Sequence, residues 1–517
     1  MSLMLLADAA SIHAPSVAYR ALSPILIILG AAMLGVLVEA VIPRAERYVT
    51  QLVITLGGLV AATISVALLH GTAETTVSGA LAIDGAGLFL QGTILLLAIM
   101  SVLLVAERSV DVGSAIVASA ALVVGSPADR RLARTDRIQT EVFPLLLFAV
   151  SGMLIFTVSS NLLLMFVALE VMSLPLYLMA GLSRRRRLLS QEAAMKYFLL
   201  GAFASAFFLY GLALLYGYAN SVDLGAILHA TQTSAKSDIL LYAGLALLLV
   251  GLLFKAGIAP FHNWTPDVYQ GSPTPVTAFM ASCTKVAAFG AILRVLYVAF
   301  NATAWDWRPI VWAVAIASMA VGAIFGLTQT DLKRILAYSS IAHAGFIMVA
   351  MVALTKDGIS SVLFYLLTYG FSTLAAFGLL TLVRDADGEA SHLSQWSGLA
   401  RKSPLLATVM TVLLMSMAGI PLTAGFVGKF YVFRAAYHVA GPLVVMALLF
   451  SAIAAFYYLR VVVLMFFAEP PEHGPTISIP GWSTTVALTF GVFVTVFLGI
   501  VPQPVLDLAA KAAKLVG

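Results

Sequence analysis

Charged residues are scarce in this sequence: only 10% of its 517 residues are Asp, Glu, Lys or Arg, whereas about a quarter is usual in a soluble domain. Hydrophobic residues make up 61% of the chain, and the mean hydropathy is +1.01. A water-soluble fold cannot place so many apolar side chains away from water. The composition therefore predicts a protein whose main partner is a lipid bilayer.

Cysteine and nucleotide-binding motifs are almost absent as well. The single cysteine, Cys283, excludes a disulfide framework, a CxxC pair and a cysteine-held zinc or iron–sulfur site. Neither a GxGxxG fingerprint nor a phosphate-binding Walker loop occurs. We therefore expect no cofactor and no metal in this chain, and its driving force must come from an ion gradient or a partner subunit. The net charge of +5 lies in short loops, so no nucleic-acid partner is expected.

Long hydrophobic runs dominate what remains. A run of about 20 apolar residues crosses the hydrocarbon core of a bilayer as a helix, and about fourteen such runs follow one another along the chain. Their starts fall near residues 22, 51, 82, 142, 161, 194, 238, 275, 309, 336, 359, 404, 442 and 482. The predicted fold is therefore all-α and polytopic. Residues 1–21 lack the basic region and cleavage site of a signal peptide, so we expect this segment to be retained.

Basic residues are concentrated in alternate loops. They are Arg44, Arg47, Arg130, Arg131, Arg134, Arg137, Arg184 to Arg187, Lys333, Arg334, Arg401 and Lys402. Loops rich in Lys and Arg stay in the cytoplasm, which predicts that both termini lie outside. Residues 108–140 are interpreted as a cytoplasmic insert because a further helix there would reverse every later loop.

Two predicted helices look broken. The seventh contains a break between Gly251 and Pro260, and the twelfth has the centre SMAGIPLTAGFVGKF. They are five helices apart, as in two inverted five-helix repeats with a broken helix in each half, a pattern that marks transport pathways. The alternative is that Gly and Pro are simply tolerated in membrane helices. The predicted division is a three-helix segment with its insert (1–141), a first repeat (142–300), a second repeat (301–470) and a C-terminal helix with a tail (471–517).

Four charged residues fall inside predicted spans: Glu170, Lys255, Lys285 and Lys429. A charge at the bilayer centre costs about 2.5 to 3.5 kcal/mol even on lenient scales, so these positions are candidate functional sites. The alternative is snorkelling, in which a long side chain carries its charge to the interface. That explanation is accepted for Arg294 and Arg460 and stays open for Lys255 and Lys429, whereas Lys285 lies too deep.

Lysines inside a membrane suit proton transfer. Removal from water favours the neutral form of the amine, whereas a nearby carboxylate favours the charged form. Glu170 needs an internal partner, and Lys255 is the candidate. Movement of Glu170 toward Lys255 would then favour proton uptake by the Lys255 amine, and movement away would favour release of that proton.

Three further residues are candidate relays: His343, His262 and Lys333. His343 follows Tyr338, Ser339 and Ser340 within one predicted helix. A lone intramembrane histidine is more often a hydrogen-bonding contact between helices, and Lys333 is also explained as a topology signal. Both alternatives stay open at this point.

The motifs GLLFKAGIAPFHNWTPDVYQGSPTPV, LKRILAYSSIAHAGF and AGIPLTAGFVGKFYVF resemble the subunit N family of bacterial NADH-quinone oxidoreductases (respiratory complex I). The resemblance covers about residues 145–465. It implies that Glu170 and Lys255 form a coupling pair, that Lys285 is the central proton carrier and that Lys429 is the carrier at the outlet.

The same resemblance implies the setting of the protein. It would lie in the bacterial inner membrane beside the antiporter-like subunit M and small membrane subunits. Electrons would pass from NADH through FMN and iron–sulfur clusters to quinone in partner subunits. The alternative is a subunit of a multisubunit cation/proton antiporter, which tends to carry WLPDAH where this chain reads WTPDVYQGSP. A third reading is a structural subunit with vestigial charges.

Overall fold

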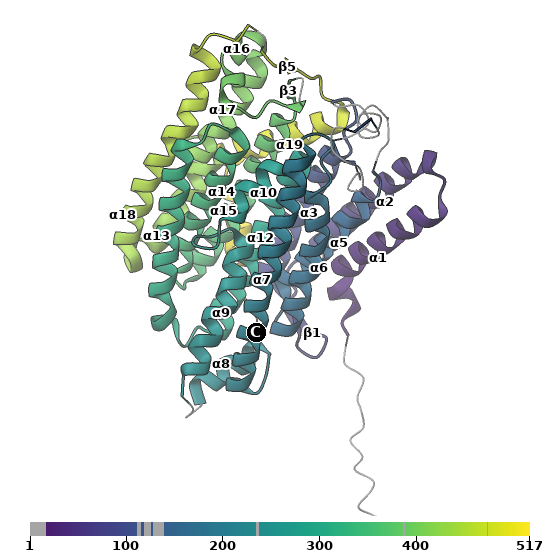
Figure 1. Cartoon of the computed structure of the whole chain (residues 1–517). Helices are drawn as coiled ribbons and strands as arrows, with labels where there is room; N and C mark the ends of the chain where they lie inside the picture. Colours follow the sequence, from purple (N-terminus) through teal and green to yellow (C-terminus); the bar gives the residue numbers. More distant parts are fainter. Residues whose placement is uncertain are drawn as a thin grey trace, which may run out of the picture.

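The computed structural model describes residues 17–110, 115–117, 126–127, 139–233, 237–385, 388–472 and 474–516. Its helices run mostly alongside one another and form one bundle, with short strands and helices at the two ends (Figure 1). The all-α membrane fold is confirmed. Within the described residues, twelve helices are long and apolar enough to cross a membrane, and two shorter apolar helices accompany them.

The first part of the bundle contains five elements. They are α1 (Tyr19–Val41), α2 (Arg44–Leu68), β1 (Glu74–Thr76), β2 (Leu81–Ile83) and α3 (Gly85–Val105). Strands β1 and β2 pair antiparallel, with Glu74 opposite Ile83. Helix α3 begins after Asp84, whose carboxylate accepts a hydrogen bond from the Gly87 amide and so caps the helix N-terminus.

The middle of the chain supplies the next group of helices. They are α5 (Val142–Val158), α6 (Leu162–Ala180), α7 (Arg187–Ala219), α8 (Leu224–Thr233), α9 (Ile239–Ala256) and α10 (Trp264–Gly271). One further span follows without interruption, as α11 (Thr274–Phe279), η1 (Met280–Thr284), α12 (Lys285–Arg294) and η2 (Val295–Ala299). Both η1 and η2 are π-helical, and such turns are frequent at functional sites.

The last part of the chain completes the bundle. It contains α13 (Ala304–Thr328), α14 (Leu332–Met351), α15 (Lys356–Leu380), β3 (Val383–Asp385), β4 (Gly388–Glu389), the 3-10 turn η3 (Leu393–Trp396), α16 (Leu399–Lys402), α17 (Pro404–Ala418), α18 (Ala424–Phe467), β5 (Thr476–Ile477), α19 (Trp482–Ile500) and α20 (Gln503–Ala512). Strand β3 pairs antiparallel with both β4 and β5.

The fourteen predicted runs all correspond to apolar helices, but some limits differ. Helices α2 and α7 begin at Arg44 and Arg187, about seven residues before their predicted starts near 51 and 194. Their first turns are polar, so hydropathy alone does not detect them. The predicted twelfth span is α17 together with the first part of α18. The thirteenth is the rest of α18, after non-helical backbone at Ala440.

Burial separates inner helices from outer ones. The span Thr274–Ala299 is completely buried, and α14 and α15 are nearly so, whereas α2, α7 and α18 expose much of their surface. Large apolar side chains such as Phe203 and Phe456 lie on the exposed faces, as expected where lipid replaces water. Lys285 therefore lies on the most enclosed span of the bundle.

The two predicted breaks are real, and each lies at a glycine. Helix α9 is regular through Ala256 and ends at Gly257, whose φ is +67°. Helix α17 ends at Ala418 before Gly419, whose φ is +86°. Only glycine adopts this left-handed conformation readily. The first break is therefore narrower than the range Gly251 to Pro260 suggested.

The bundle has two distinct ends. One end, which we call the basic face, brings together Arg185 and Arg186 before α7, Lys333 at the start of α14 and Arg384 of β3. The other end, the C-terminal face, carries the start of α3 and the C-terminal tail, which are joined where the Val516 amide donates to Asp84. Figure 1 shows α16 and β3 at the first end and the C-terminus at the second.

Most of the predicted insert at 108–140 lies outside the described residues. Among its described residues, Ala115 to Val117 contact the basic loop between α6 and α7. There the Arg184 amide donates to Ala115 over 3.0 Å, and the Val117 amide donates to Leu182 over 2.8 Å. This part of the insert therefore lies at the basic face.

Arg294 was interpreted as a snorkelling residue, and this interpretation is wrong. Its side chain is fully buried, and its guanidinium forms an ion pair with the equally buried Asp84 at 2.9 Å. The same guanidinium donates to the carbonyls of Thr157 (3.1 Å) and Val516 (3.0 Å). The pair thus fixes the end of α12, the start of α3 and the C-terminal tail in one place.

Removal of one partner of this ion pair should destabilise the protein strongly. Arg294→Gln leaves the Asp84 charge buried without its partner, which costs about 3 to 5 kcal/mol. We expect less assembled complex in membranes and a lower unfolding temperature in detergent. Combination with Asp84→Asn should recover part of the loss because no isolated charge remains. Arg460→Gln, at a half-buried arginine, is the matched control, and equal stability of Arg294→Gln and wild type would contradict this role.

Candidate functional site

Lys255 lies in the last turn of α9, at the first break, and is buried. Its Nζ donates to the Ser173 hydroxyl (2.8 Å) and to the Tyr197 hydroxyl (3.1 Å). A cation in the last turn of a helix also faces the negative end of the helix dipole. Lys255 therefore holds its amine inside the bundle and does not snorkel to an interface.

Glu170 lies on α6, one turn before Ser173. No ion pair joins its carboxylate to Lys255 within the described part of the chain, so the structure does not bring the predicted coupling pair into contact. Its Oε1 is buried and has no hydrogen-bond partner there. A buried carboxylate oxygen without a hydrogen-bond partner is costly. Glu170 can therefore accept a hydrogen bond from a nearby donor.

Lys285 begins α12, directly after the π-helical turn η1, and is buried. Its Nζ donates to the backbone carbonyl of Ser340 on α14 over 2.6 Å and lies 5.5 Å from the centre of the Tyr369 ring. No carboxylate forms an ion pair with Lys285 among the residues described. Its environment thus consists of neutral donors and acceptors, in which an amine can exchange a proton.

Lys429 lies near the start of α18, beyond the second break, and is buried. Its Nζ donates to the carbonyls of Met417 (3.0 Å) and Ala418 (2.9 Å) and to the Ser451 hydroxyl (2.8 Å). The last carbonyls of a helix have no partner within that helix. The break in α17 therefore supplies the acceptors that hold this lysine deep in the bundle.

His343 connects polar groups of three helices. Its Nδ1 is 2.7 Å from the Tyr365 hydroxyl, and its Nε2 is 3.3 Å from the Tyr458 hydroxyl. Tyr458 is also hydrogen-bonded to Ser339. A neutral imidazole donates through one nitrogen and accepts through the other, and a tyrosine hydroxyl does both. The group can therefore pass a proton as well as hold the helices together.

A small cavity extends this polar group toward the second break. It is lined by His343, Tyr365, Tyr369, Ser416, Met417 and Gly425, among others, and has a volume of about 10 Å³. That is about the room needed by one water molecule. Because Met417 accepts the hydrogen bond from Lys429, the cavity lies between His343 and that lysine.

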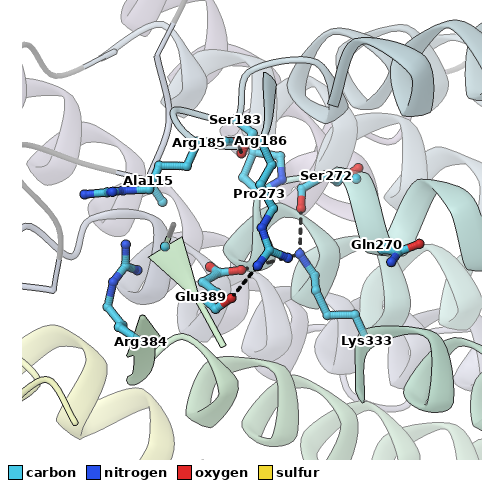
Figure 2. A pocket seen from close by; sticks show the side chains of 12 residues that line it. Ala115, Ser183, Arg185, Arg186, Gln270, Ser272, Pro273, Lys333, Arg384 and Glu389 are labelled. Carbon is cyan, nitrogen blue, oxygen red and sulfur yellow. Dashed lines mark hydrogen bonds and ion pairs between the residues drawn. The ribbon is translucent and has the colours of Figure 1, made fainter. Parts of the chain in front are cut away.

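Lys333 lies at the basic face, whereas the other candidate lysines lie inside the bundle. Its Nζ donates to the Ser272 carbonyl at 2.9 Å and is 3.5 Å from Glu389. Figure 2 shows Lys333, Arg186 and Glu389 directed toward one another. All three line a pocket of about 40 Å³. Helix α14 carries Lys333 at this end and Ser340 and His343 further along.

His262 is half-buried in the connection between α9 and α10. Burial lowers the pKa of its imidazole, and a backbone hydrogen bond at Pro260 opposes this effect. No hydrogen bond joins His262 to Lys255 or Lys285 in the described part of the chain. The structure therefore does not place His262 in one group with the lysines.

The WTPDVYQGSP signature fixes the surroundings of Lys255. The Trp264 ring stacks on Tyr197 with 4.6 Å between the ring centres, and its Nε1 donates to the Phe254 carbonyl over 2.9 Å. Asp267 accepts hydrogen bonds from Lys196 (2.7 Å) and Arg334 (2.8 Å). Burial alone would raise the pKa of Asp267, but these two cations hold it below its usual range. The signature thus ties α7, α10 and α14 together.

The neutral partners of the charged residues were not predicted from the sequence. Ser173, Tyr197, Tyr369 and Ser451 contact the lysines, and Tyr365 and Tyr458 contact His343. One signal was available, because Tyr365 and Tyr369 are four residues apart and so lie on one face of α15. Nothing in the sequence separated the two serines from other serines in membrane helices.

Comparison with known proteins places this arrangement in a family. Residues 159–470 match the family model described as NADH:quinone oxidoreductase/Mrp antiporter, TM. The chain is 60% identical over 506 residues to the NADH-quinone oxidoreductase subunit N of Saccharopolyspora erythraea, which covers 96% of this chain and 98% of that protein.

Two solved structures show the same fold. A chain of respiratory complex I from Thermus thermophilus with bound aureothin matches with a TM-score of 0.75 and 37% identity, over 94% of this chain and 99% of that chain. A chain of the Mrp complex from Dietzia sp. DQ12-45-1b matches with a TM-score of 0.81 over 96% of this chain and 97% of that chain, but its 22% identity establishes the fold alone. The chain belongs to the subunit N family of the NADH-quinone oxidoreductases.

Proposed function

We propose that this chain is a proton-translocating subunit of the membrane arm of an NADH-quinone oxidoreductase. NADH oxidation and quinone reduction take place in partner subunits that hold FMN and iron–sulfur clusters, and their redox energy drives protons from the cytoplasm outward through this chain. Its neighbours in the arm are the antiporter-like subunit M and small membrane subunits. The enzyme is thus a translocase to which this chain contributes no redox centre.

One observation carries the proposal: four titratable side chains, in chain order from the first break to the second, are buried inside the bundle. Lys255, Lys285, His343 and Lys429 all have neutral hydrogen-bond partners from neighbouring helices. Intramembrane ionisable residues are costly and mark ion pathways. We propose that Lys285 is the central carrier, that Lys429 is the carrier on the outlet side and that a water in the small cavity joins Lys429 to His343.

Coupling requires that protonation of Lys255 depends on Glu170. In the structure no ion pair joins the two described side chains: Ser173 is hydrogen-bonded to Lys255, and Glu170 Oε1 has no hydrogen-bond partner. Approach of the carboxylate favours the charged amine, and withdrawal favours proton release.

The Glu170–Lys255 pair is tested by a double-mutant cycle. Glu170→Ala and Lys255→Ala should each impair NADH-driven proton uptake, and their combination should cost less than the sum. The coupling free energy should lie within about 0.5 to 3 kcal/mol, as for interacting neighbours. Glu170→Asp should be partly tolerated, and Ser173→Ala serves as the control for a lost neutral partner. Strict additivity would show that the two groups act independently.

The orientation is proposed from the basic face, which we assign to the cytoplasm with both termini outside. The lone cysteine, Cys283, is buried, so single introduced cysteines report accessibility cleanly. A membrane-impermeant maleimide added to intact cells should label Gln503→Cys on the C-terminal face and leave Arg401→Cys on the basic face unlabelled. Both positions are exposed. Labelling of Arg401→Cys before cell lysis would reverse the orientation.

The proposed organisation of the chain follows the two breaks. Residues 142–300 form one inverted repeat and 301–470 the other, preceded by residues 1–141 and followed by 471–517. The equivalent position of the breaks in α9 and α17 supports this division, because each ends a helix at a left-handed glycine and places a lysine at the helix end.

The second candidate function is a subunit of a cation/proton antiporter, favoured only by the shared fold with the Mrp chain. The deciding experiment is purification of the complex that contains this chain, followed by measurement of NADH:quinone activity and of NADH-driven proton uptake into inverted vesicles. Both should be present. A purified complex that exchanges cations for protons and does not oxidise NADH would establish the antiporter instead.

A further inference from the structure

An apolar groove opens at the C-terminal face, and none of Lys255, Lys285 and Lys429 lines it. It lies between the end of α2, the start of α3, the middle of α15 and the terminal helix α20, and has a volume of about 630 Å³. Typical small-molecule sites have volumes of about 300 to 1,000 Å³. Its walls include Leu88, Phe89 and Leu96 of α3, Leu367 of α15 and Leu508 of α20.

The groove has the depth of one membrane leaflet. Its α3 wall runs from Gly85 through Leu88 and Gly92 to Leu96, which forms a stripe along one helix face. At a rise of 1.5 Å per residue this stripe is about 16 Å long, and half of the hydrocarbon core is about 15 Å thick. Gly92 leaves room in the wall, because the nearest atom to a Cβ there would be Val66 Cγ1 at 3.6 Å. An extended acyl chain fits this shape.

The mouth of the groove is cationic. Lys511 of α20 and Lys514 just beyond it line the mouth together with His70 at the end of α2. Both lysines are exposed, and the amine of neither makes a hydrogen bond or ion pair within the described residues. The neighbouring acid on α20, Asp507, instead accepts a hydrogen bond from Gln503 at 2.7 Å.

Helix α20 holds this cationic mouth at the interface. Its Leu506, Ala509 and Ala512 are buried against the bundle, and the Lys514 carbonyl accepts a hydrogen bond from the Ala86 amide at the start of α3. The lysines are therefore fixed at the level where α3 enters the membrane, which is the level of lipid phosphates.

We propose that this groove is a binding site for one anionic phospholipid of the leaflet at the C-terminal face. The phosphate lies between Lys511 and Lys514, and one acyl chain runs along α3 from Gly85 to Leu96. A fixed pair of cations above an apolar groove matches the two halves of such a lipid. The site is independent of the lysines inside the bundle.

The test uses phosphatidylglycerol with a photoactivatable diazirine in one acyl chain, and the purified complex reconstituted in phosphatidylcholine vesicles. After irradiation, peptide mapping should find the label within residues 66–67 and 88–96. In the double variant Lys511→Ala, Lys514→Ala, the mole fraction of probe lipid that gives half-maximal labelling should rise about 30-fold. Lys356→Ala, at an exposed lysine of the same face, should leave it unchanged.

A second variant fills the groove while keeping its charges. Gly92→Leu should suppress labelling of residues 88–96, whereas Gly57→Leu, which adds the same side chain to an open position on α2, should not. Equal labelling by a diazirine phosphatidylcholine would overturn the anionic site. Absence of label, or cross-linking of these residues to a helix of a partner subunit instead, would overturn the lipid site altogether.

Discussion

Replacement of Lys285 by methionine should abolish proton pumping while the complex still assembles. Methionine has a similar length and no titratable group. A positioned proton donor or acceptor typically contributes about 100-fold or more to a transfer rate, so NADH-driven proton uptake should fall by at least that factor. Uptake is measured in inverted vesicles and normalised to assembled complex.

The structure explains why this change should leave the fold intact. Lys285 makes one hydrogen bond, to the Ser340 carbonyl, and no ion pair within the described residues. A buried charge without a counter-ion is costly, so its replacement by an apolar side chain of similar volume removes a desolvation penalty. A loss of pumping would therefore report the missing proton site rather than misfolding.

The control for Lys285 is Lys356→Met, which removes an exposed lysine at the C-terminal face and should pump normally. Undiminished pumping by Lys285→Met would favour the reading of the chain as a structural subunit with vestigial charges. Loss of assembled complex would instead identify Lys285 as a structural residue, which its single hydrogen bond does not suggest.

The fold could be predicted well because the bilayer restricts the choice. Only helices satisfy their own backbone hydrogen bonds in lipid, so each long apolar run had one structural solution. The polar first turns of α2 and α7 were missed because a search for apolar runs does not detect polar helical turns. The π-helical turn before Lys285 was also missed, since its sequence, MASCT, gives no local signal for the extra residue per turn.

The charged residues of the site could be predicted, but their partners could not. A charge within an apolar run is visible because it is costly there, which identified Lys255, Lys285 and Lys429. A serine or tyrosine costs much less, and its role depends on which helices pack together. The hydrogen bond between Ser173 and Lys255 is such a contact, and the sequence alone did not predict it.

The buried partner of Arg294 could not be predicted from the sequence either. From the sequence it lay near a helix end, where a long side chain usually reaches water. Its partner, Asp84, is 210 residues away in the sequence, before a helix that packs against α12 only in the folded protein. Contacts over such a separation have no signal in one sequence.

Lys429→Arg should stop pumping although it preserves the positive charge. If Lys429 carries protons to the outlet, it must alternate between its charged and neutral forms, and a guanidinium stays protonated. We expect proton uptake to fall by about 100-fold or more, with NADH-driven uptake into inverted vesicles again as the measurement.

The site of Lys429 determines how its variants should be ranked. Its amine donates hydrogen bonds to Met417, Ala418 and Ser451. A replacement must therefore donate a hydrogen bond to these acceptors and also gain and lose a proton. A protonated glutamate can do both, whereas alanine can do neither. Lys429→Glu should therefore retain more pumping than Lys429→Ala, and both variants should be compared at equal amounts of assembled complex. An arginine would also donate hydrogen bonds to these acceptors. If Lys429 had only a structural role, Lys429→Arg would therefore be tolerated. Wild-type pumping in that variant would show that Lys429 holds the break together without carrying protons.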